Sequence, residues 1–290
     1  VPARGGYLKT LHGTAVGLIF ETDKTVIVAL PGPPRELQPM VVNELLPYLR
    51  GRFGVRPRGA SLTLRFVGVG QSQITQTIKE SVPVPADMTI TSLFEGGRVD
   101  FTFSTPANTP AAEATLARLK EQIRDKLGEY LYADDGSSLE DAVIRKLQAA
   151  GGTLVLAEVC TGGQLDASLN SAAGAPKVMA GCFAAPTEEA LARLIGTEAD
   201  HWCASSPAAE RAKGLAISAA RRTQSAWSLA AGQSQAEADG SQWAWAALRS
   251  PDGRLATQRL AVRATDDAAR AQLVTQLLDF LRRQLAKPKP

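Results

Sequence analysis

The chain has 290 residues, of which 44% are hydrophobic and 21% are charged, and its formal net charge is +3. These values are typical of a globular protein with two or three domains and exclude a disordered chain. The longest apolar runs fall far short of the roughly 20 residues that cross a bilayer, and no signal-like segment is present. We therefore expect a cytoplasmic protein with no membrane partner. The basic residues form no tract, so nucleic acid binding is not indicated.

The cysteine and histidine content predicts no zinc site. Cys160, Cys182 and Cys203 are widely spaced, no CxxC pair occurs, and the only histidines are His12 and His201. His201 and Cys203 could share a metal only with ligands from elsewhere in the chain. We expect small buried thiols in a reducing compartment.

The first predicted elements are a hairpin of residues 15–21 and 24–30 and a helix over residues 41–50. Between them, the run Leu30-Pro31-Gly32-Pro33-Pro34 forms a tight turn, because three prolines and a glycine cannot continue a strand ladder. Such a turn can present the N–H groups of the next helix to an anion, which makes Gly32 and Pro33 candidate phosphate ligands. An ordinary strand-to-helix connection is the alternative.

The next block, after a glycine and proline linker, predicts a two-layer α+β fold. An alternating strand covers residues 62–66, and a turn leads to a helix over residues 74–80 that Ser72 caps. A hairpin of residues 87–94 and 98–104 follows, with Val99, Phe101 and Phe103 on one face, and then a long helix over residues 111–127. The β-α-β-β-α order places both helices on one face of a sheet.

The third block begins at Ser138, which forms a capping box with Asp141 at the start of a helix over residues 139–149. A strand over residues 153–157 leads into the turn Glu158-Val159-Cys160-Thr161-Gly162-Gly163. The remaining predicted elements are a short helix at 164–171, a helix at 208–220, strands at 224–229, 243–248 and 255–262, and a terminal helix at 266–285. Trp243 and Trp245 are expected to share one buried strand face.

Two of these elements carry a resemblance to a known family. Gly13-Thr14-Ala15, followed by Leu30-Pro31-Gly32-Pro33-Pro34-Arg35-Glu36-Leu37, resembles the CinA family, and the turn at residues 158–163 is similar to its deamidase motif. The resemblance implies an α/β and α+β protein with three parts. Residues 1–58 are expected to be the carboxy-terminal part of a molybdopterin-binding-like domain, residues 59–136 a KH-like domain, and residues 137–290 a three-layer deamidase-like domain. We expect Val1 to be an internal boundary. We expect the KH-like part to be a spacer and interface domain, because Gly68-Val69-Gly70 is not a GXXG loop.

The resemblance also implies where the deamidase chemistry should lie. The family's nucleophilic serine falls at Val159, its tyrosine at Pro186 and its lysine at Leu191. None of these three side chains can attack an amide or move a proton. Thr161 retains a hydroxyl but has no adjacent base, so we predict an inactive deamidase-like domain. Thr161, Gly162 and Gly163 are candidates for nucleotide binding only.

The family implies three alternative functions. The first is an ADP-ribose pyrophosphatase that uses a divalent metal such as Mg²⁺, carried by the intact leading domain, with Gly13 and Thr14 near the phosphates and Glu36 at most as a metal ligand. The second is an active nicotinamide-mononucleotide deamidase. The third is a non-catalytic nucleotide-binding or assembly protein linked to competence and DNA damage. The expected partners are a small-molecule nucleotide and a second copy of the chain.

Overall fold

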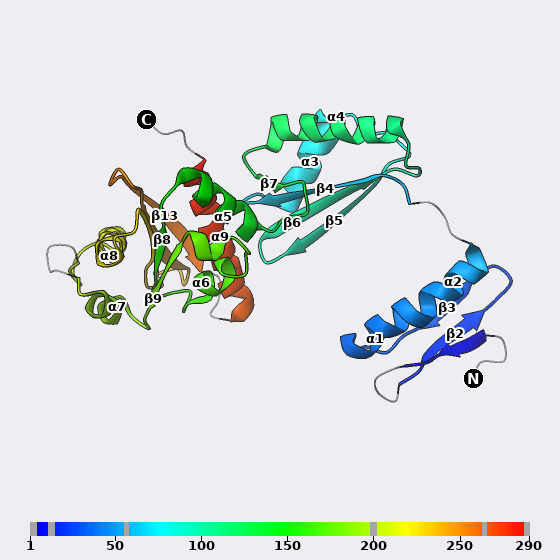
Figure 1. Cartoon of the computed structure of the whole chain (residues 1–290), viewed down its shortest axis with the longest axis horizontal. Coiled ribbons are helices and arrows are strands. Elements are labelled where there is room, and N and C mark those ends of the chain that lie inside the picture. The colour runs from blue at the N-terminus through cyan, green and yellow to red at the C-terminus, as the bar shows by residue number, and fades with distance from the viewer. Residues whose placement is uncertain (1–4, 11–14, 55–57, 198–201, 263–265, 287–290) are drawn as a thin grey trace. The chain divides into compact units, whose positions relative to one another are not determined.

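The computed structural model describes residues 5–10, 15–54, 58–197, 202–262 and 266–286 (Figure 1). The chain is a mixed α/β protein, as predicted, and forms two compact units, Val1–Arg58 and Gly59–Pro290. The described residues build three separate sheets. Within this part of the chain, none of the helices has the length and apolar character that crossing a membrane requires.

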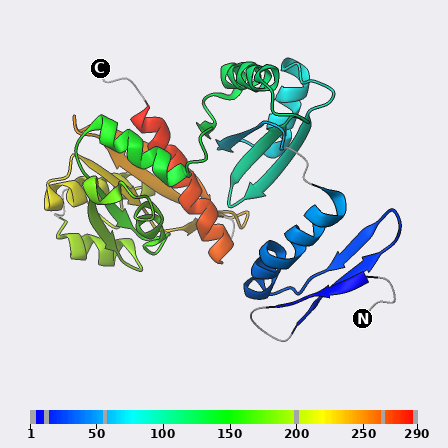
Figure 2. The same cartoon turned by 45° about the vertical axis from the view of Figure 1, so that its right-hand side comes forward.

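The first unit is a small antiparallel sheet covered on one face by a helix (Figure 2). Its strands pair in the order β1 (Gly5–Leu8), β2 (Gly17–Glu21) and β3 (Val26–Ala29). The hairpin of β2 and β3 was predicted from the sequence, whereas β1, which opens with two glycines, was not. The core of the unit contains Leu8, Ile19 and Met40, while Tyr7, Phe20 and Ile27 are exposed.

The helix of this unit begins earlier than the sequence predicts. It starts directly after the proline turn and runs through α1 (Pro34–Met40), the π-helical turn η1 (Val41–Leu45) and α2 (Leu46–Phe53). Pro34 at its first position needs no hydrogen-bond acceptor there, which favours a helix start. Pro47 has no N–H, and in an α-helix its ring would clash with the carbonyl four residues earlier. The π-helical turn before it widens the helix there, since the Leu46 N–H donates to the Val41 carbonyl five residues earlier.

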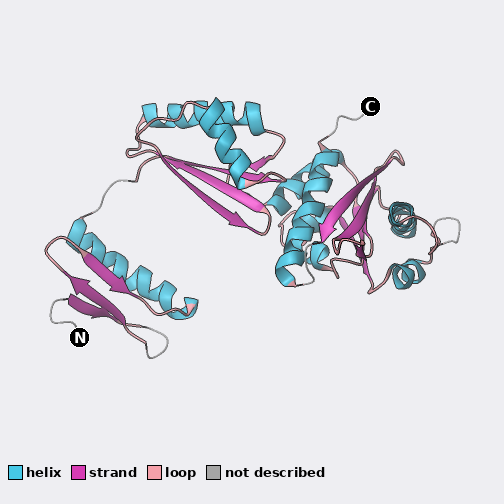
Figure 3. Ribbon diagram, turned by 180° about the vertical axis from the view of Figure 1, so that it is seen from behind, coloured by secondary structure: helices cyan, strands magenta, loops and turns pink. Residues whose placement is uncertain are grey.

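The second unit opens with the predicted two-layer sandwich. Its sheet has the order β5-β6-β4-β7, and both helices cover the same face (Figure 3). Val99, Phe101 and Phe103 are buried under these helices, as predicted. The elements are β4 (Ser61–Val67), α3 (Gln71–Ser81), β5 (Thr89–Glu95), β6 (Arg98–Ser104), α4 (Pro110–Leu127) and β7 (Leu131–Ala133).

Two details of this sandwich differ from the prediction. The N-cap of α3 is Gly70, not Ser72, because the helix starts one turn earlier and no side chain caps it. The short strand β7 has no clear sequence pattern, and it forms because it pairs with Arg65 and Phe66 of β4. The β5–β6 turn does follow the prediction, since Gly96 and Gly97 both take positive φ angles, of 56° and 85°.

The rest of the second unit is a three-layer α/β domain. Its sheet has the order β11-β12-β10-β8-β9, and β13 pairs with β12. Helices α5, α6 and α9 cover one face, and α7 and α8 cover the other (Figure 1). The elements are α5 (Leu139–Ala150), β8 (Leu154–Glu158), α6 (Gln164–Leu169), the 3₁₀ turn η2 (Ala175–Lys177), β9 (Met179–Ala184), α7 (Glu188–Ile195), α8 (Ala208–Thr223), β10 (Trp227–Ala231), β11 (Gln235–Ala236), β12 (Gln242–Arg249), β13 (Leu255–Val262) and α9 (Asp267–Leu285).

The sequence analysis did not predict β9 or α7, and its expectation of a buried aromatic face on β12 is wrong. Trp243 and Trp245 on β12 are only half-buried, and the buried positions of this strand are mainly alanines. Small side chains allow helix α8 to pack closely on β12. The guanidinium of Arg259 lies 3.9 Å from the centre of the Trp243 ring, so this indole is stacked by a cation at the surface.

Candidate functional site

The candidate site lies at the carboxyl ends of three parallel strands, β8, β9 and β10, in the sheet of the three-layer domain. Strand β8 pairs in parallel with β9 on one side and with β10 on the other. Ligands of open α/β sheets bind at the carboxyl ends of such strands. The residues that follow these ends are therefore the first place to look for chemistry: 158–163 after β8, 185–188 after β9 and 232–234 after β10.

The turn after β8 is organised by Glu158, which is completely buried. Its carboxylate accepts hydrogen bonds from the Thr161 hydroxyl at 2.5 Å, the Leu165 N–H at 3.1 Å and the Asp166 N–H at 2.8 Å. The thiol of Cys182 on β9 lies 3.4 Å from the same group. A buried carboxylate is tolerated only with such partners. Glu158 therefore acts as the N-terminal anchor of α6.

Several groups that acyl transfer could use are engaged inside the fold. Thr161, the hydroxyl-bearing residue of this turn, is fully buried and donates to Glu158. Several backbone N–H groups of the turn and of the first turn of α6 also have acceptors inside the fold: those of Val159, Gly162, Gln164, Leu165 and Asp166. Gly162 and Gly163 adopt positive φ angles of 61° and 89°, which turn the chain into the helix.

Val159 and Leu191, to which the resemblance assigns the family's serine and lysine, lie in one hydrophobic cluster. Val159 is 8% exposed and Leu191 is 0% exposed, and both belong to the cluster between β8 and helices α7 and α8. Pro186 is exposed just before Thr187, whose hydroxyl accepts the Ala190 N–H at the start of α7. These three side chains carry no titratable group.

Two charged residues that the sequence analysis did not select meet at this edge. Glu188, in the first turn of α7, is 4% exposed and forms an ion pair with Arg211 of α8. The Glu188 carboxylate also accepts the Gln233 N–H at 2.8 Å, and Arg211 donates to the Ser206 carbonyl at 2.7 Å. A Cβ on Gly232 would lie 2.6 Å from a Glu188 oxygen. The ion pair thus fills the space between the ends of β9 and β10.

A glutamate in the first turn of a helix is a common helix-start residue, so sequence alone gave no reason to single out Glu188. The partner lies 23 residues away on another helix. The fold, rather than any motif, brings the two together.

The cysteines near this edge are not nucleophiles. Burial raises the pKa of Cys160 to about 12, and burial together with the Glu158 charge raises the pKa of Cys182 further. Both thiols are therefore protonated at neutral pH. The expectation of buried thiols is wrong for Cys203, which is exposed and lies 3.1 Å from the Ser205 hydroxyl in the segment that precedes α8.

The candidate residues of the first unit form a separate group. Gly13 and Thr14 lie outside the described residues. Gly32 and Pro33 are exposed, and the Pro33 carbonyl accepts the N–H groups of Glu36 and Leu37, each at 3.0 Å. Glu36 is half-buried, and its Oε2 atom is buried without a hydrogen-bond partner.

Neither unit offers a ready metal site within the described ranges. No group of three His, Cys, Asp or Glu side chains that could share a metal ion occurs there. Glu36 alone does not make a binding site for a divalent cation, because such ions take several oxygen ligands. Within the described residues, Glu36 could therefore supply one ligand of a metal site, and no complete set of ligands is assembled around it.

The second unit also contains a polar seam, where the sandwich meets the three-layer domain. Arg98 of β6 donates to both oxygens of Glu140 on α5, at 2.9 and 2.6 Å, and the Ser168 hydroxyl of α6 donates to the same carboxylate at 2.6 Å. Burial alone would raise the pKa of Glu140, but the hydrogen bonds from Arg98 and Ser168 outweigh it, and the pKa is lowered. A cavity of about 570 Å³ beside this network is lined by residues of β5, β6, α6 and α9.

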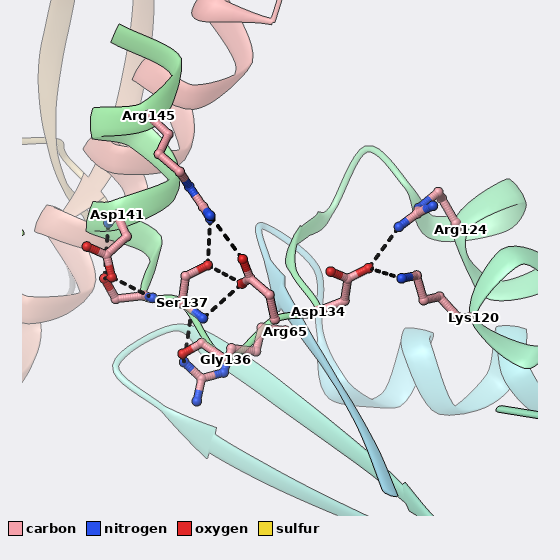
Figure 4. A network of polar contacts seen from close by, with 10 residues as sticks. Arg65, Lys120, Arg124, Asp134, Gly136, Ser137, Asp141 and Arg145 are labelled. Atoms are coloured by element: carbon pink, nitrogen blue, oxygen red, sulfur yellow. Dashed lines mark hydrogen bonds and ion pairs between the residues drawn. The ribbon is translucent and has the colours of Figure 1, made fainter. Parts of the chain in front are cut away.

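The seam continues along α9 and along the connection between the two domains. Arg282 and Asp279 on α9 are buried and bonded at 2.6 Å, and Arg282 also donates to the Glu129 carbonyl. Figure 4 shows the connection itself, where Arg65 donates to the carbonyls of Gly136 and Ser137 at 3.1 Å each. Ser138 and Asp141 then form the predicted capping box of α5. The seam thus carries several paired charges that link the sandwich to the three-layer domain.

Comparison with known proteins identifies two matching families. The family described as "CinA C-terminal domain" matches residues 136–285, and the one described as "Damage-inducible protein CinA KH domain" matches residues 61–133. A putative competence-damage inducible protein of Symbiobacterium thermophilum is 36% identical over 199 residues, which are 68% of this chain and 47% of the relative. A CinA-like protein of Kosmotoga olearia is 33% identical over 202 residues, which are 68% of this chain and 48% of the relative. The chain spans about half the length of the curated relatives that it matches.

Solved structures of the same superfamily are more distant. A CinA superfamily protein from Enterobacter cloacae is 20% identical, with a TM-score of 0.45 over 54% of this chain and 97% of its own. A CinA superfamily protein from Klebsiella pneumoniae is 25% identical, with a TM-score of 0.43 over 51% of this chain and 96% of its own.

Proposed function

Because the chain belongs to the CinA family, we propose that its third domain keeps a deamidase-like fold without deamidase chemistry. One observation carries the proposal: the positions of the family's nucleophile and lysine, Val159 and Leu191, are buried in a single hydrophobic cluster. An amide carbon cannot be attacked there, because neither side chain has a lone pair or a proton to transfer.

The remaining polar groups of the turn do not replace the missing ones. Amide hydrolysis needs a nucleophile, a base beside it and free donors for the oxyanion. The Thr161 hydroxyl donates to Glu158, which also holds two amides of α6. Removing Glu158 from these contacts to use it as a base would leave buried donors without acceptors, which is costly. The turn is therefore a structural anchor in this proposal.

A second candidate activity concerns the first unit. We propose an ADP-ribose pyrophosphatase-type activity for the domain to which residues 1–58 belong, as the family resemblance implies. The specific observation in its favour is Glu36, whose Oε2 is buried and without a hydrogen-bond partner behind the proline turn. Such an atom is an available ligand for a cation, although other ligands would have to join it.

The test is a pair of turnover assays on the same purified protein. We expect no ammonia from nicotinamide mononucleotide, with a family member that has the serine, tyrosine and lysine as the positive control. Ammonia release that Thr161→Ala abolishes would overturn the proposal and identify Thr161 as the nucleophile. For the second candidate, we expect Mg²⁺-dependent cleavage of ADP-ribose that Glu36→Gln reduces and Glu44→Gln, on the same helix, does not.

The assays also distinguish the third alternative, a non-catalytic protein. In that case neither substrate is turned over, and calorimetry with nicotinamide mononucleotide shows whether the edge near Gly162 and Gly163 still binds a nucleotide. Binding without turnover would support a nucleotide-binding role, whereas no binding would favour a role in assembly.

A further inference from the structure

The three-layer domain contains a cavity at the edge of its sheet opposite to the candidate functional site. The cavity has a volume of about 820 Å³ and is lined by residues at the starts of β10 and β13 and at the ends of β12, α5 and α9. Trp227, which lines it, pairs with Leu154 at the start of β8, whereas the turn at residues 158–163 follows the other end of β8. The length of this strand, about 13 Å, separates the two places. The cavity is therefore distinct from the candidate functional site.

Most of the lining is apolar and comes from packed strands and helices. Trp227 and Leu248 are 8% and 2% exposed and belong to the core cluster on this face of the sheet, and Leu285 of α9 packs against that cluster. The Trp227 indole N–H donates to the Gly151 carbonyl at 3.1 Å, so the ring adds only apolar surface to the cavity. Sites for small organic molecules have such walls and volumes of roughly 300–1,000 Å³. The cavity therefore fits a ligand with an apolar body.

Three charged side chains line the same cavity: Lys146 of α5, and Asp252 and Arg254 of the turn between β12 and β13. The Asp252 carboxylate is engaged within its turn, because it accepts hydrogen bonds from the Ser250 hydroxyl at 2.5 Å and from the Arg254 Nε at 2.6 Å. The Lys146 ammonium has no hydrogen bond or ion pair with any residue that the structure describes. Two cations and one carboxylate leave one net positive charge, which favours a ligand with a single negative charge.

The carboxy-terminal ends of α5 and α9 border the cavity too, and their partial negative charge opposes an anion. Part of each end is satisfied within the chain: the Leu147 carbonyl accepts the Gly151 N–H at 3.0 Å, and the Arg282 carbonyl accepts the Ala286 N–H at 3.2 Å. A helix end acts as a fraction of a unit charge, and its effect falls off within one turn, whereas lysine and arginine carry full charges. We therefore expect the two cations to decide the charge of the ligand, and a neutral ligand is the control.

We propose that this cavity binds a small organic acid, with its apolar body against Trp227 and Leu248 and its carboxylate bound by Lys146 and Arg254. The Nε of Arg254 is engaged by Asp252, which leaves the two terminal amino groups of the guanidinium for the carboxylate. The site does not depend on the proposed function, because it lies at the opposite edge of the sheet and shares no residue with the turn after β8.

The first test is calorimetry of the full chain with 2-naphthoate, which has a two-ring apolar body and one carboxylate. We expect a dissociation constant of about 100 µM. The neutral amide of the same shape, 2-naphthamide, should bind about tenfold more weakly, because it cannot form the charge-assisted hydrogen bonds. An acid that does not bind, or an amide that binds equally well or better, would overturn the proposal.

Two matched pairs of variants test the charge and the apolar body. Lys146→Gln should weaken binding of 2-naphthoate about tenfold. Lys79→Gln on α3 should not, since this exposed lysine does not line the cavity. Ala149→Trp places an indole at the exposed end of α5 and should block the cavity, whereas Ala114→Trp on α4 should leave binding unchanged. Circular dichroism confirms that all four variants are folded. Equal affinities within either pair would contradict the site.

The indole N–H signals in the nuclear magnetic resonance spectrum report where 2-naphthoate binds. Trp227 lines the cavity, whereas Trp245 lies near the carboxyl edge, where its carbonyl accepts the Gly232 N–H at 2.9 Å. We expect the Trp227 signal, identified by its absence in Trp227→Phe, to shift while the Trp245 signal stays in place. A shift of the Trp245 signal alone would place the acid at the candidate functional site and overturn the proposal. The turnover assays test the proposed function separately, so the failure of one is distinguished from the failure of the other.

Discussion

Two regions of the second unit differ in how they bury polar groups. One is the carboxyl edge of the sheet in the three-layer domain, and the other is the seam between this domain and the sandwich. At the edge, Val159 and Leu191 form part of a hydrophobic cluster. The buried Glu158 carboxylate accepts hydrogen bonds from the Thr161 hydroxyl and from backbone N–H groups of α6. At the seam, Arg98 and Glu140 remain charged and bind each other across 42 residues of sequence. The seam therefore joins two domains through an ion pair, whereas at the edge hydrophobic side chains lie next to polar groups that are bonded within the three-layer domain.

The difference shows that a buried carboxylate is not by itself a sign of catalysis. Glu158 and Glu140 are both buried, and each accepts several hydrogen bonds from within the chain. A catalytic carboxylate needs access to a substrate and a proton to exchange, and neither group has an open side in these contacts. Both residues are expected to affect stability more than turnover, which mutation can test.

The largest effect is expected for Glu158→Ala. The variant leaves the Thr161 hydroxyl and the Leu165 and Asp166 N–H groups buried without their acceptor, and we expect the free energy of unfolding to fall by about 3–5 kcal/mol. Urea unfolding followed by circular dichroism measures the change. Glu189→Ala is the control, because this glutamate is exposed and paired only with Arg193, and it should cost less than about 0.5 kcal/mol. Unchanged stability of Glu158→Ala together with loss of a measured activity would instead make Glu158 a catalytic residue.

A smaller effect is expected at the seam for Arg98→Ala. The change leaves the Glu140 carboxylate buried with Ser168 as its remaining side-chain donor, and we expect a loss of about 2–3 kcal/mol, since Arg98 itself is partly exposed. Arg193→Ala removes the guanidinium of an exposed pair and should change the free energy of unfolding by less than about 0.5 kcal/mol. Equal effects of the two substitutions would mean that the seam contributes no more than a surface ion pair.

The smallest effect is a pH dependence that arises at the same residue. The pKa of Glu140 is lower in the folded chain than in the unfolded chain, so its contribution to stability is complete above the unfolded value of about 4.3. This contribution is lost as the pH falls through the folded pKa. Thermal unfolding between about pH 3 and pH 6 should therefore show a shallower acid slope for Glu140→Gln than for the original chain. Parallel profiles would contradict the assignment.

Much of the fold could be predicted because its pattern is local. The alternation in β6, the glycine pair before it and the Ser138–Asp141 capping box each depend on residues within a few positions of one another. The prediction was wrong where a proline sets the start of a helix or where a strand forms only through a tertiary contact. The helix starts at Pro34 rather than at Val41, and β7 exists only through its pairing with β4. Neither feature has a periodicity that a short window can detect.

The candidate site was only partly predictable for the same reason. A single motif located the turn at residues 158–163 and the position, Val159, to which the resemblance assigns the family's serine. The motif could not show that the Thr161 hydroxyl is committed to Glu158, or that Glu188 pairs with Arg211 from another helix. Such pairs form between residues that are distant in sequence, and their charges look like ordinary helix-surface charges until the helices pack.

The sequence by itself determined the family of this protein, the order of most of its elements and the residue types at positions 159, 186 and 191, because each depends on residue identity at fixed positions. Only the tertiary structure decided that Val159 and Leu191 share one hydrophobic cluster, that Arg98 reaches Glu140, and that β5 is an edge strand of the sheet that the described residues form. The physical reason is that burial and hydrogen bonding depend on which elements become neighbours, and neighbours in this fold lie tens to more than a hundred residues apart in the chain.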